Sequence, residues 1–270
     1  MDGPIGQRYG PWAVIAGASD GVGAEFARQA AAAGIHCLLV ARRVDALDRL
    51  AAELRQSFGV EALCAVIDLA LPGATERMLA AAGERQIGLF VFNAGSDTFG
   101  TRLLDTPAGD WATLVSRNVS TLLASVHAFA TRMVAVGRGG LVLVGSDAAF
   151  GGSARLAVYS ATKAFALVLG ESLWAELAPK GVDVLNLVIG ATDTPKLRAV
   201  LQKNGIALTG IAMAQPRELV REAFAHLGQG PDWVLGSSEE SVNPLTSPAV
   251  RRQRVLEISR FLDLFYGKET

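Results

Sequence analysis

The sequence predicts an α/β protein in which a doubly wound parallel sheet lies between two layers of helices. Three observations support this fold class. Short apolar runs alternate with helical patterns, a glycine-rich turn follows the first run, and polar residues follow several later runs. Runs of valine, isoleucine and leucine without polar alternation are typical of parallel strands that are covered on both faces. Right-handed crossovers place the carboxyl ends of such strands at one edge, where α/β proteins bind ligands.

Seven apolar runs are predicted as strands, and longer patterns between them are predicted as helices. The strands cover residues 13–16, 37–40, 63–67, 87–92, 141–144, 182–189 and 233–235. The helices cover residues 24–33, 45–58, 75–82, 111–136 and 161–178. Because no linker rich in proline, serine or glycine divides the chain, we predict a single domain over residues 1–270.

Composition and charge exclude several classes of function. A formal net charge of -1 gives no electrostatic reason to expect a nucleic-acid partner. No apolar run approaches ~18 residues and the N-terminus lacks a signal pattern, so we expect no membrane partner and a cytoplasmic location. Cys37 and Cys64 fall in strand-like runs and are expected to be buried thiols in a reducing compartment. His36, His127 and His226 match no ligand spacing, so no metal site is predicted.

A glycine turn joins the first predicted strand to the first helix. Gly17, Gly21 and Gly23 have the spacing of a dinucleotide-binding turn. In such a turn the first glycine makes the bend, the second lets a pyrophosphate approach the backbone, and the third packs the helix against the strand. Alone, the turn also fits a loop without a ligand. No Gly-Lys-Ser/Thr ends it, which argues against a nucleotide triphosphatase.

Ser146, Tyr159 and Lys163 join a hydroxyl, a phenol and an amine. Tyr159 and Lys163 are four residues apart in a predicted helix and therefore share one face, while Ser146 follows the strand 141–144. A cation within ~4 to 6 Å lowers a phenol pKa from about 10 by ~1 to 3 units. Such a phenol suits proton transfer in carbonyl reduction and alcohol oxidation, and a serine hydroxyl stabilises charge on the substrate oxygen. Alone, the pair also fits an exposed Tyr and Lys on a helix.

The residues after the second predicted strand indicate which nicotinamide cofactor the chain prefers. Arg42 and Arg43 stand where a carboxylate would bind the ribose 2'-hydroxyl of NAD, and an arginine matches the 2'-phosphate of NADP. Asp20 in the glycine turn opposes this reading, because its charge would repel a nearby phosphate. We predict that NADP(H) is favoured over NAD(H).

Taken in order, these motifs resemble the short-chain dehydrogenase/reductase superfamily, of the single-domain Tyr-x-x-x-Lys type. The resemblance covers about residues 10–195 and includes Gly17, Gly21, Gly23, Asp68, Asn93, Ala94, Gly95, Asn118, Ser146, Tyr159 and Lys163. It implies an extended Rossmann fold of about seven strands. It also implies an oxidoreductase that interconverts a secondary alcohol and a ketone by hydride transfer, with tyrosine as the acid–base residue.

The resemblance also implies the roles of individual residues. The catalytic set is Asn118, Ser146, Tyr159 and Lys163, in which Asn118 would position a water beside Lys163. The cofactor-binding set is Gly17, Ser19, Asp20, Gly21, Val22, Gly23, Arg42, Arg43, Asp68, Leu69, Asn93, Ala94, Gly95, Tyr159, Lys163, Ile189, Thr192 and Thr194. The chain departs from the family pattern at Ala16 (usually Thr), at Phe92 (usually Asn), and at Ile189-Gly190 (usually Pro-Gly).

The family's substrate loop corresponds here to about residues 191–213, and it predicts the kind of substrate. Its apolar residues are Leu197, Val200, Leu201, Ile206, Leu208 and Ile211, with few fixed charges. Together with Phe150 and Leu156, they predict a hydrophobic pocket for alicyclic, aromatic, steroid-like or fatty carbonyls and alcohols. The same apolar residues also fit packing on the core.

The C-terminal stretch predicts an amphipathic helix over about residues 248–265. Val255, Ile258, Leu262 and Phe265 recur at spacings of three and four. The resemblance implies a homodimer or homotetramer formed through the long helices, to which this tail adds buried area unless it packs on its own core. A non-catalytic NADP-binding sensor or structural protein on the same fold is the alternative function. The presence of all four polar groups of the catalytic set favours catalysis.

Overall fold

A seven-stranded parallel sheet forms the centre of the computed structural model, which describes residues 4–96, 100–152, 155–203, 212–235, 247–253 and 255–257. The strand order is β3-β2-β1-β4-β5-β6-β7, and each neighbouring pair is parallel. The strands are β1 (Trp12–Ala16), β2 (His36–Ala41), β3 (Ala62–Val66), β4 (Ile87–Phe92), β5 (Gly139–Val144), β6 (Val182–Val188) and β7 (Asp232–Val234). This arrangement confirms the predicted fold class.

The α-helices of the described residues are α1 (Pro4–Tyr9), α2 (Gly21–Ala32), α3 (Val44–Phe58), α4 (Ala74–Ala82), α5 (Ala108–Val115), α6 (Leu122–Val136), α7 (Ala157–Leu177), α8 (Pro195–Lys203) and α9 (Pro216–His226). The apolar patterns predicted four of them closely, namely α2, α3, α4 and α7. The predicted helix 111–136 is α5 and α6 joined by a π-helical turn, Ser116–Thr121. The prediction omitted α1, α8 and α9. For α9 the signal was present, because Leu219, Val220, Ala223 and Phe224 recur at helical spacing and all are buried.

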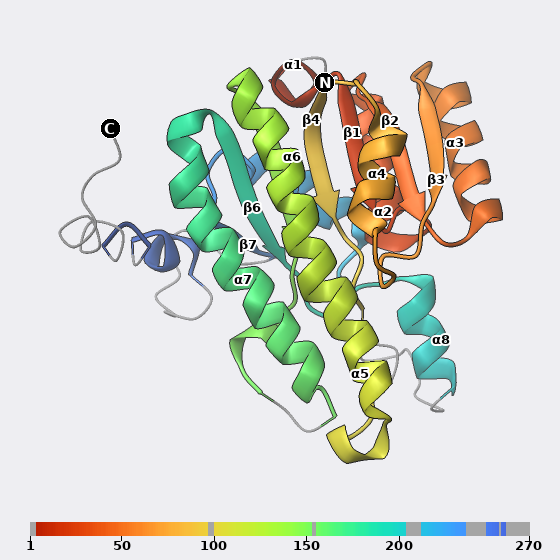
Figure 1. Cartoon of the computed structure of the whole chain (residues 1–270), viewed down its shortest axis with the longest axis vertical. Coiled ribbons are helices and arrows are strands. Elements are labelled where there is room, and N and C mark those ends of the chain that lie inside the picture. The colour runs from red at the N-terminus through yellow and green to blue at the C-terminus, as the bar shows by residue number, and fades with distance from the viewer. Residues whose placement is uncertain are drawn as a thin grey trace.

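Two hydrophobic clusters cover the two faces of the sheet. Helices α4, α6 and α7 pack on the face that is turned toward the viewer in Figure 1, where α6 and α7 run side by side. Helices α2, α3 and α9 pack on the other face. Phe90 of β4 stacks on Phe129 of α6 with ring centroids 4.5 Å apart. On the opposite face Phe26 of α2 meets Phe224 of α9 edge to face at 5.6 Å.

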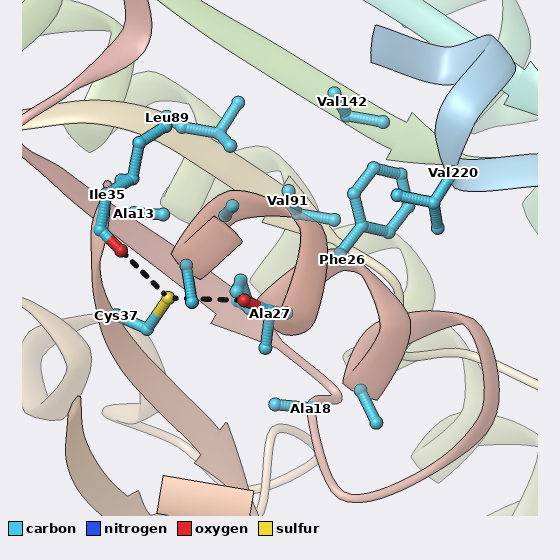
Figure 2. Packing of buried hydrophobic residues seen from close by; sticks show 14 of the residues in the cluster. Ala13, Ala18, Phe26, Ala27, Ile35, Cys37, Leu89, Val91, Val142 and Val220 are labelled. Atoms are coloured by element: carbon cyan, nitrogen blue, oxygen red, sulfur yellow. Dashed lines mark hydrogen bonds between the residues drawn. The ribbon is translucent and has the colours of Figure 1, made fainter. Parts of the chain in front are cut away.

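The cysteines differ in burial. Cys37 is fully buried, and its thiol donates weak hydrogen bonds to the carbonyl oxygens of Ile35 (3.6 Å) and Ala27 (3.7 Å), as Figure 2 shows. Burial raises the pKa of Cys37 to about 12, which keeps it an unreactive thiol. The expectation of a buried thiol is confirmed for Cys37, whereas Cys64 is only partly buried.

The continuous helix Ala108–Val136 is long and apolar enough, by length and composition, to cross a membrane. The core helix of a soluble protein meets the same criterion. Here Leu122, Val126 and Phe129 lie on its buried face and pack in the cluster beneath α6. We therefore interpret it as a core helix. Polar residues such as Arg117 and Asn118 interrupt its apolar positions, so the predicted helix 111–136 contains no uninterrupted apolar run of membrane-spanning length.

The sheet places its ligand edge between β1 and β4. The chain leaves β3 at one side of the sheet and returns to form β4 beside β1, which makes a topological switch point at their carboxyl ends. The glycine turn follows β1 and Asn93 follows β4. Helix α8 lies beyond the carboxyl ends of the strands (Figure 1). Residues 248–253 and 255–257 are helical and fall at the start of the expected C-terminal helix, whereas Ile258, Leu262 and Phe265 lie outside the described residues.

Candidate active site

The glycine turn forms a backbone cradle in which side chains are excluded. Gly17 has φ +91, and a Cβ there would lie 2.8 Å from the Ala94 nitrogen. A Cβ at Gly23 would collide with the Gly17 carbonyl oxygen and lie 2.6 Å from Asn93 Nδ2. The Asn93 amide donates a 2.9 Å hydrogen bond to that same carbonyl oxygen, which ties the turn to β4. A cradle of this kind at the start of α2 fits the pyrophosphate of a dinucleotide.

Two arginines form the cationic rim beside this cradle. Arg43 donates a 2.9 Å hydrogen bond to Ser19 Oγ and forms an ion pair with Asp20. Arg42 lies 3.6 Å from a carboxylate oxygen of Asp68. Both guanidinium groups are exposed. Arg43 therefore offsets the negative charge of Asp20 in the glycine turn.

The side chain of Lys163 is buried. Its Nζ donates a 2.9 Å hydrogen bond to the carbonyl oxygen of Val144, the last residue of β5. Burial, with a smaller contribution from the positive charge of Arg117, lowers the pKa of Lys163 to about 8. The ammonium lies 5.7 Å from the ring centroid of Tyr159, in the first turn of α7. The predicted pair therefore shares one face of the helix.

Ser146 lies two residues beyond β5 with its hydroxyl oriented by two local contacts. Its Oγ donates to an Asp147 carboxylate oxygen at 3.1 Å and accepts from the Ala148 amide at 3.2 Å. Ser146, Tyr159 and Lys163 all line one cavity. The hydrogen bond from Lys163 to Val144 explains how a strand end and a helix start come together there.

Asn118 occupies the π-helical turn in the middle of the long helix, and such turns occur frequently at functional sites. Its side chain is buried. Nδ2 donates to the Gly95 carbonyl oxygen and to Thr162 Oγ1, each at 3.0 Å. A space of about 10 Å³ beside it is lined by Asn118, Thr162 and Lys163 among others. That volume approaches what one water needs.

Arg117 is a site residue that the sequence did not mark. Its guanidinium donates to Asn118 Oδ1 and to the Ser96 carbonyl oxygen, each at 3.2 Å. Its charge contributes to the lowered pKa of Lys163. No spacing rule identifies it, because its role depends on the packing of the π-helical turn against α7.

The cavity has a volume of about 660 Å³ and contains ten of the predicted site residues in its lining. They are Asp20, Gly21, Val22, Asn93, Ser146, Tyr159, Lys163, Ile189, Thr192 and Thr194. Leu69, another predicted cofactor contact, is not among the residues that line the cavity. Its side chain is buried in the core, and its carbonyl oxygen accepts a 2.8 Å hydrogen bond from Thr121.

The predicted apolar lid is present only in part. Leu156, Leu197 and Val200 line the cavity, whereas Leu201 is a buried residue of α8 outside the lining. The Phe150 ring contacts the guanidinium of Arg251, 5.4 Å from the ring centroid. Three further residues, Ile206, Leu208 and Ile211, lie outside the described part of the chain.

Basic side chains also line the cavity, and two of them come from the predicted substrate loop, which was expected to carry few fixed charges. Arg155, Lys196 and Lys203 line the same cavity. The sequence pattern drew attention to the apolar residues of α8, but Lys196 and Lys203 share the helix face of Val200 at spacings of four and three. That spacing was a signal that could have found them.

Comparison with known proteins places this geometry in a family. The family model described as short chain dehydrogenase matches residues 11–205. The chain belongs to the short-chain dehydrogenase/reductase family. This short-chain dehydrogenase is therefore an oxidoreductase that acts on CH-OH groups with a nicotinamide nucleotide.

Individual relatives extend the likeness along most of the chain. The 7beta-hydroxysteroid dehydrogenase of Collinsella aerofaciens is 34% identical over 240 residues, which are 88% of this chain and 90% of the relative. A solved 7beta-hydroxysteroid dehydrogenase structure has a TM-score of 0.81 at 31% identity and covers 94% of this short-chain dehydrogenase and 99% of its own chain. A short-chain dehydrogenase from Sphingobium yanoikuyae in complex with NADPH has a TM-score of 0.76 at 29% identity, with coverage of 96% and 97%.

Proposed function

We propose that this short-chain dehydrogenase interconverts a secondary alcohol and a ketone on a hydrophobic, steroid-sized substrate, with NADP(H) as cofactor and Tyr159 as the acid–base residue. The observation that carries the proposal is the convergence of Ser146, Tyr159 and Lys163 on one cavity of about 660 Å³. The glycine cradle at the start of α2 adjoins that cavity through Asp20 and Gly21.

Three side chains of the site share the acid–base chemistry. When bound, the cofactor supplies the hydride to the carbonyl carbon in reduction and accepts it in oxidation. The Tyr159 hydroxyl donates its proton to the carbonyl oxygen, and the Lys163 ammonium stabilises the phenolate that remains. Ser146 Oγ turns from Asp147 to donate a hydrogen bond to the oxygen on which charge develops. In oxidation the Tyr159 phenolate takes the proton from the alcohol.

A water in the small space beside Lys163 would return the proton to Tyr159 in this scheme. Asn118 and Thr162 line that space and are joined by a 3.0 Å hydrogen bond. Asn118 therefore acts as a positioning residue for the water. The hydrogen bond from Asn118 Nδ2 to the Gly95 carbonyl oxygen keeps the amide in place.

The cationic rim supports the NADP(H) part of the proposal. Arg42 and Arg43 present exposed guanidinium groups, which match a phosphate by bidentate hydrogen bonds. A relative with 29% identity was solved with NADPH. Replacing Arg42 and Arg43 by Gln should weaken NADPH binding about tenfold for each and leave NADH binding nearly unchanged. Arg49→Gln on the exposed face of α3 is the matched control. Equal losses for both cofactors would count against the assignment.

The size and lining of the cavity support a large apolar substrate. Leu156, Leu197, Val200 and Ile189 contribute apolar wall, and the volume of about 660 Å³, which the cofactor and the substrate share, is in the ~300 to 1,000 Å³ range of small-molecule sites. A relative with 34% identity is a 7beta-hydroxysteroid dehydrogenase. A panel of ketones of rising size should give catalytic efficiencies that increase toward ring systems.

Replacing Tyr159 by Phe tests the mechanism directly. The variant should lose about 10²- to 10⁴-fold in kcat while binding NADPH as tightly as the parent, because only the proton donor is removed. Turnover is measured by NADPH oxidation with a ring ketone, and binding by NADPH fluorescence. A variant as fast as the parent would refute the role. A parent that binds NADPH but turns over no carbonyl in the panel would favour the non-catalytic alternative.

We also propose a homo-oligomer whose interface includes α6 and α7. Leu123 and Val168 are exposed apolar side chains on these two helices, which run side by side in Figure 1.

We propose as well that the chain forms a single domain and that the protein is cytoplasmic. In support of the latter, Cys37 and Cys64 are free thiols, as expected in a reducing compartment.

A further inference from the structure

Three basic side chains line the cavity in addition to Lys163. Arg155 comes from the segment that leads into α7, while Lys196 and Lys203 come from the first and last turns of α8. Asp20 is the one acidic residue among the described residues of the lining, and its carboxylate already forms an ion pair with Arg43. The cavity wall therefore carries surplus positive charge.

The face of α8 that borders the cavity has a regular pattern. Lys196, Val200 and Lys203 follow one another at spacings of four and three, so they form one stripe along the helix. Lys196 also bonds Ser96 Oγ. An apolar residue between two cations suits a ligand that has an apolar body and an anionic group.

Arg155 is held at the wall in an unfavourable backbone conformation. Its φ is 73, and no other non-glycine residue in the described part of the chain has a positive φ. Strained conformations of this kind cluster at ligand sites, where the surrounding structure maintains them. Its guanidinium makes a long 3.5 Å contact with the Gly100 carbonyl oxygen. The salt bridges formed within the described ranges include neither Arg155 nor Lys203.

We propose that Arg155, Lys196 and Lys203 form a subsite that binds a carboxylate group of the substrate. This carboxylate lies at the end of the substrate molecule that is remote from the reacting carbonyl. The substrate class is then an apolar, ring-sized ketone or alcohol with an acidic side chain. The proposal rests on the proposed function, because it treats this cavity as the substrate site. Charge-assisted hydrogen bonds from three cations in a partly enclosed cavity give the selectivity.

A matched pair of substrates tests the subsite, namely a ring ketone with a carboxylate side chain and its methyl ester. The parent should prefer the acid about tenfold or more in kcat/KM, and calorimetric titration of the NADPH-loaded protein should show the same preference in Kd. The double variant Arg155→Asn, Lys203→Gln should lose the preference, because KM for the acid rises much more than KM for the ester, which carries no anionic group. Asparagine tolerates the positive φ, so the backbone is preserved.

Two controls separate charge from structure. Arg155→Lys should keep most of the preference for the acid, because it keeps the cation. Lys180→Gln, a lysine outside the cavity lining, should behave as the parent.

Each remaining outcome decides the proposal. Equal treatment of acid and ester by the parent would overturn it. So would a double variant that loses NADPH affinity but keeps the preference, since the cations would then serve the phosphates of the cofactor. If the parent reduces no ketone, the proposed function fails. The calorimetric preference for the acid still tests the subsite in that case.

Discussion

Lys163 Nζ donates a 2.9 Å hydrogen bond to the Val144 carbonyl oxygen, which holds an ammonium of α7 at the carboxyl end of β5. Ser146 follows two residues later, so this contact brings the hydroxyl and the amine to the same cavity. The ammonium is buried and lies near the charge of Arg117, and both effects lower its pKa, to about 8. The protonation state of Lys163 therefore changes close to working pH.

The pH dependence of reduction should reflect this titration. Below about pH 8 Lys163 carries its proton and stabilises the Tyr159 phenolate, so kcat/KM for ketone reduction should fall as pH rises through about 8. Arg117→Gln removes a repelling charge, which raises the pKa of Lys163 and moves the decline to higher pH. Lys163→Arg, which stays charged, should remove this decline. A pH–rate profile whose decline is unmoved in Arg117→Gln would contradict the electrostatic coupling.

The glycine turn should tolerate no side chain at Gly23. A Cβ there meets the Gly17 carbonyl oxygen and Asn93 Nδ2, so Gly23→Ala should destabilise the fold by ~1 to 3 kcal/mol and weaken NADPH binding more than tenfold. Thermal unfolding and NADPH fluorescence measure the two effects. Gly109→Ala is the control. In the first turn of α5 no atom outside the local helix backbone lies within 4 Å of an added Cβ, so unchanged stability or a gain of up to about 1 kcal/mol is expected. Normal NADPH affinity in Gly23→Ala would rule out a close cradle.

Glu171 should make the fold less stable as pH rises. Glu171 and Asp232 share the Arg251 guanidinium at 2.6 and 2.8 Å. Burial, followed by repulsion from Asp232, raises the pKa of Glu171 from 4.5 to about 7. Because the folded state binds the proton more tightly, the penalty is absent below about pH 4.5, grows as pH rises, and is complete above about pH 7.

Glu171→Gln should remove that penalty. Its melting temperature should exceed that of the parent at pH 8, and the difference should shrink at pH 5. Glu176→Gln, at an exposed position of the same helix, should show no such trend. A Glu171→Gln variant that is less stable than the parent at pH 8 would show that the Arg251 ion pair outweighs the burial of its charge.

The proposed interface predicts that charges on the long helices dissociate the oligomer. Leu123 is 47% exposed and Val168 is 58% exposed, so an Asp at either position should leave the monomer folded and prevent apolar burial between subunits. The mass measured by light scattering should fall to that of one chain. Val44→Asp, 48% exposed on α3, should keep the assembly of the parent. An unchanged mass in both test variants would exclude this face.

The strands were predictable because burial on both faces leaves an unmistakable local pattern. The run 87–92 coincides with β4, and the other six strands begin or end within two residues of the predictions. The glycine turn was equally legible, since its close approaches admit no other residue. Helix α8 was missed because its apolar residues were interpreted as part of a loop that covers the site.

The sequence by itself determined the fold class, the glycine cradle and the order of the catalytic set, because strand periodicity, helix spacing and turn chemistry are local properties. Only the tertiary structure decided which charges meet. It pairs Asp20 with Arg43, brings Arg117 near Lys163, and lines one cavity with Arg155 and two lysines of α8. Such partners come from elements far apart in the chain, and the packing of helices on the sheet, which no local pattern encodes, sets their distances and their burial. The Tyr159 and Lys163 spacing predicts a reaction, whereas the electrostatic environment of that reaction comes from the fold.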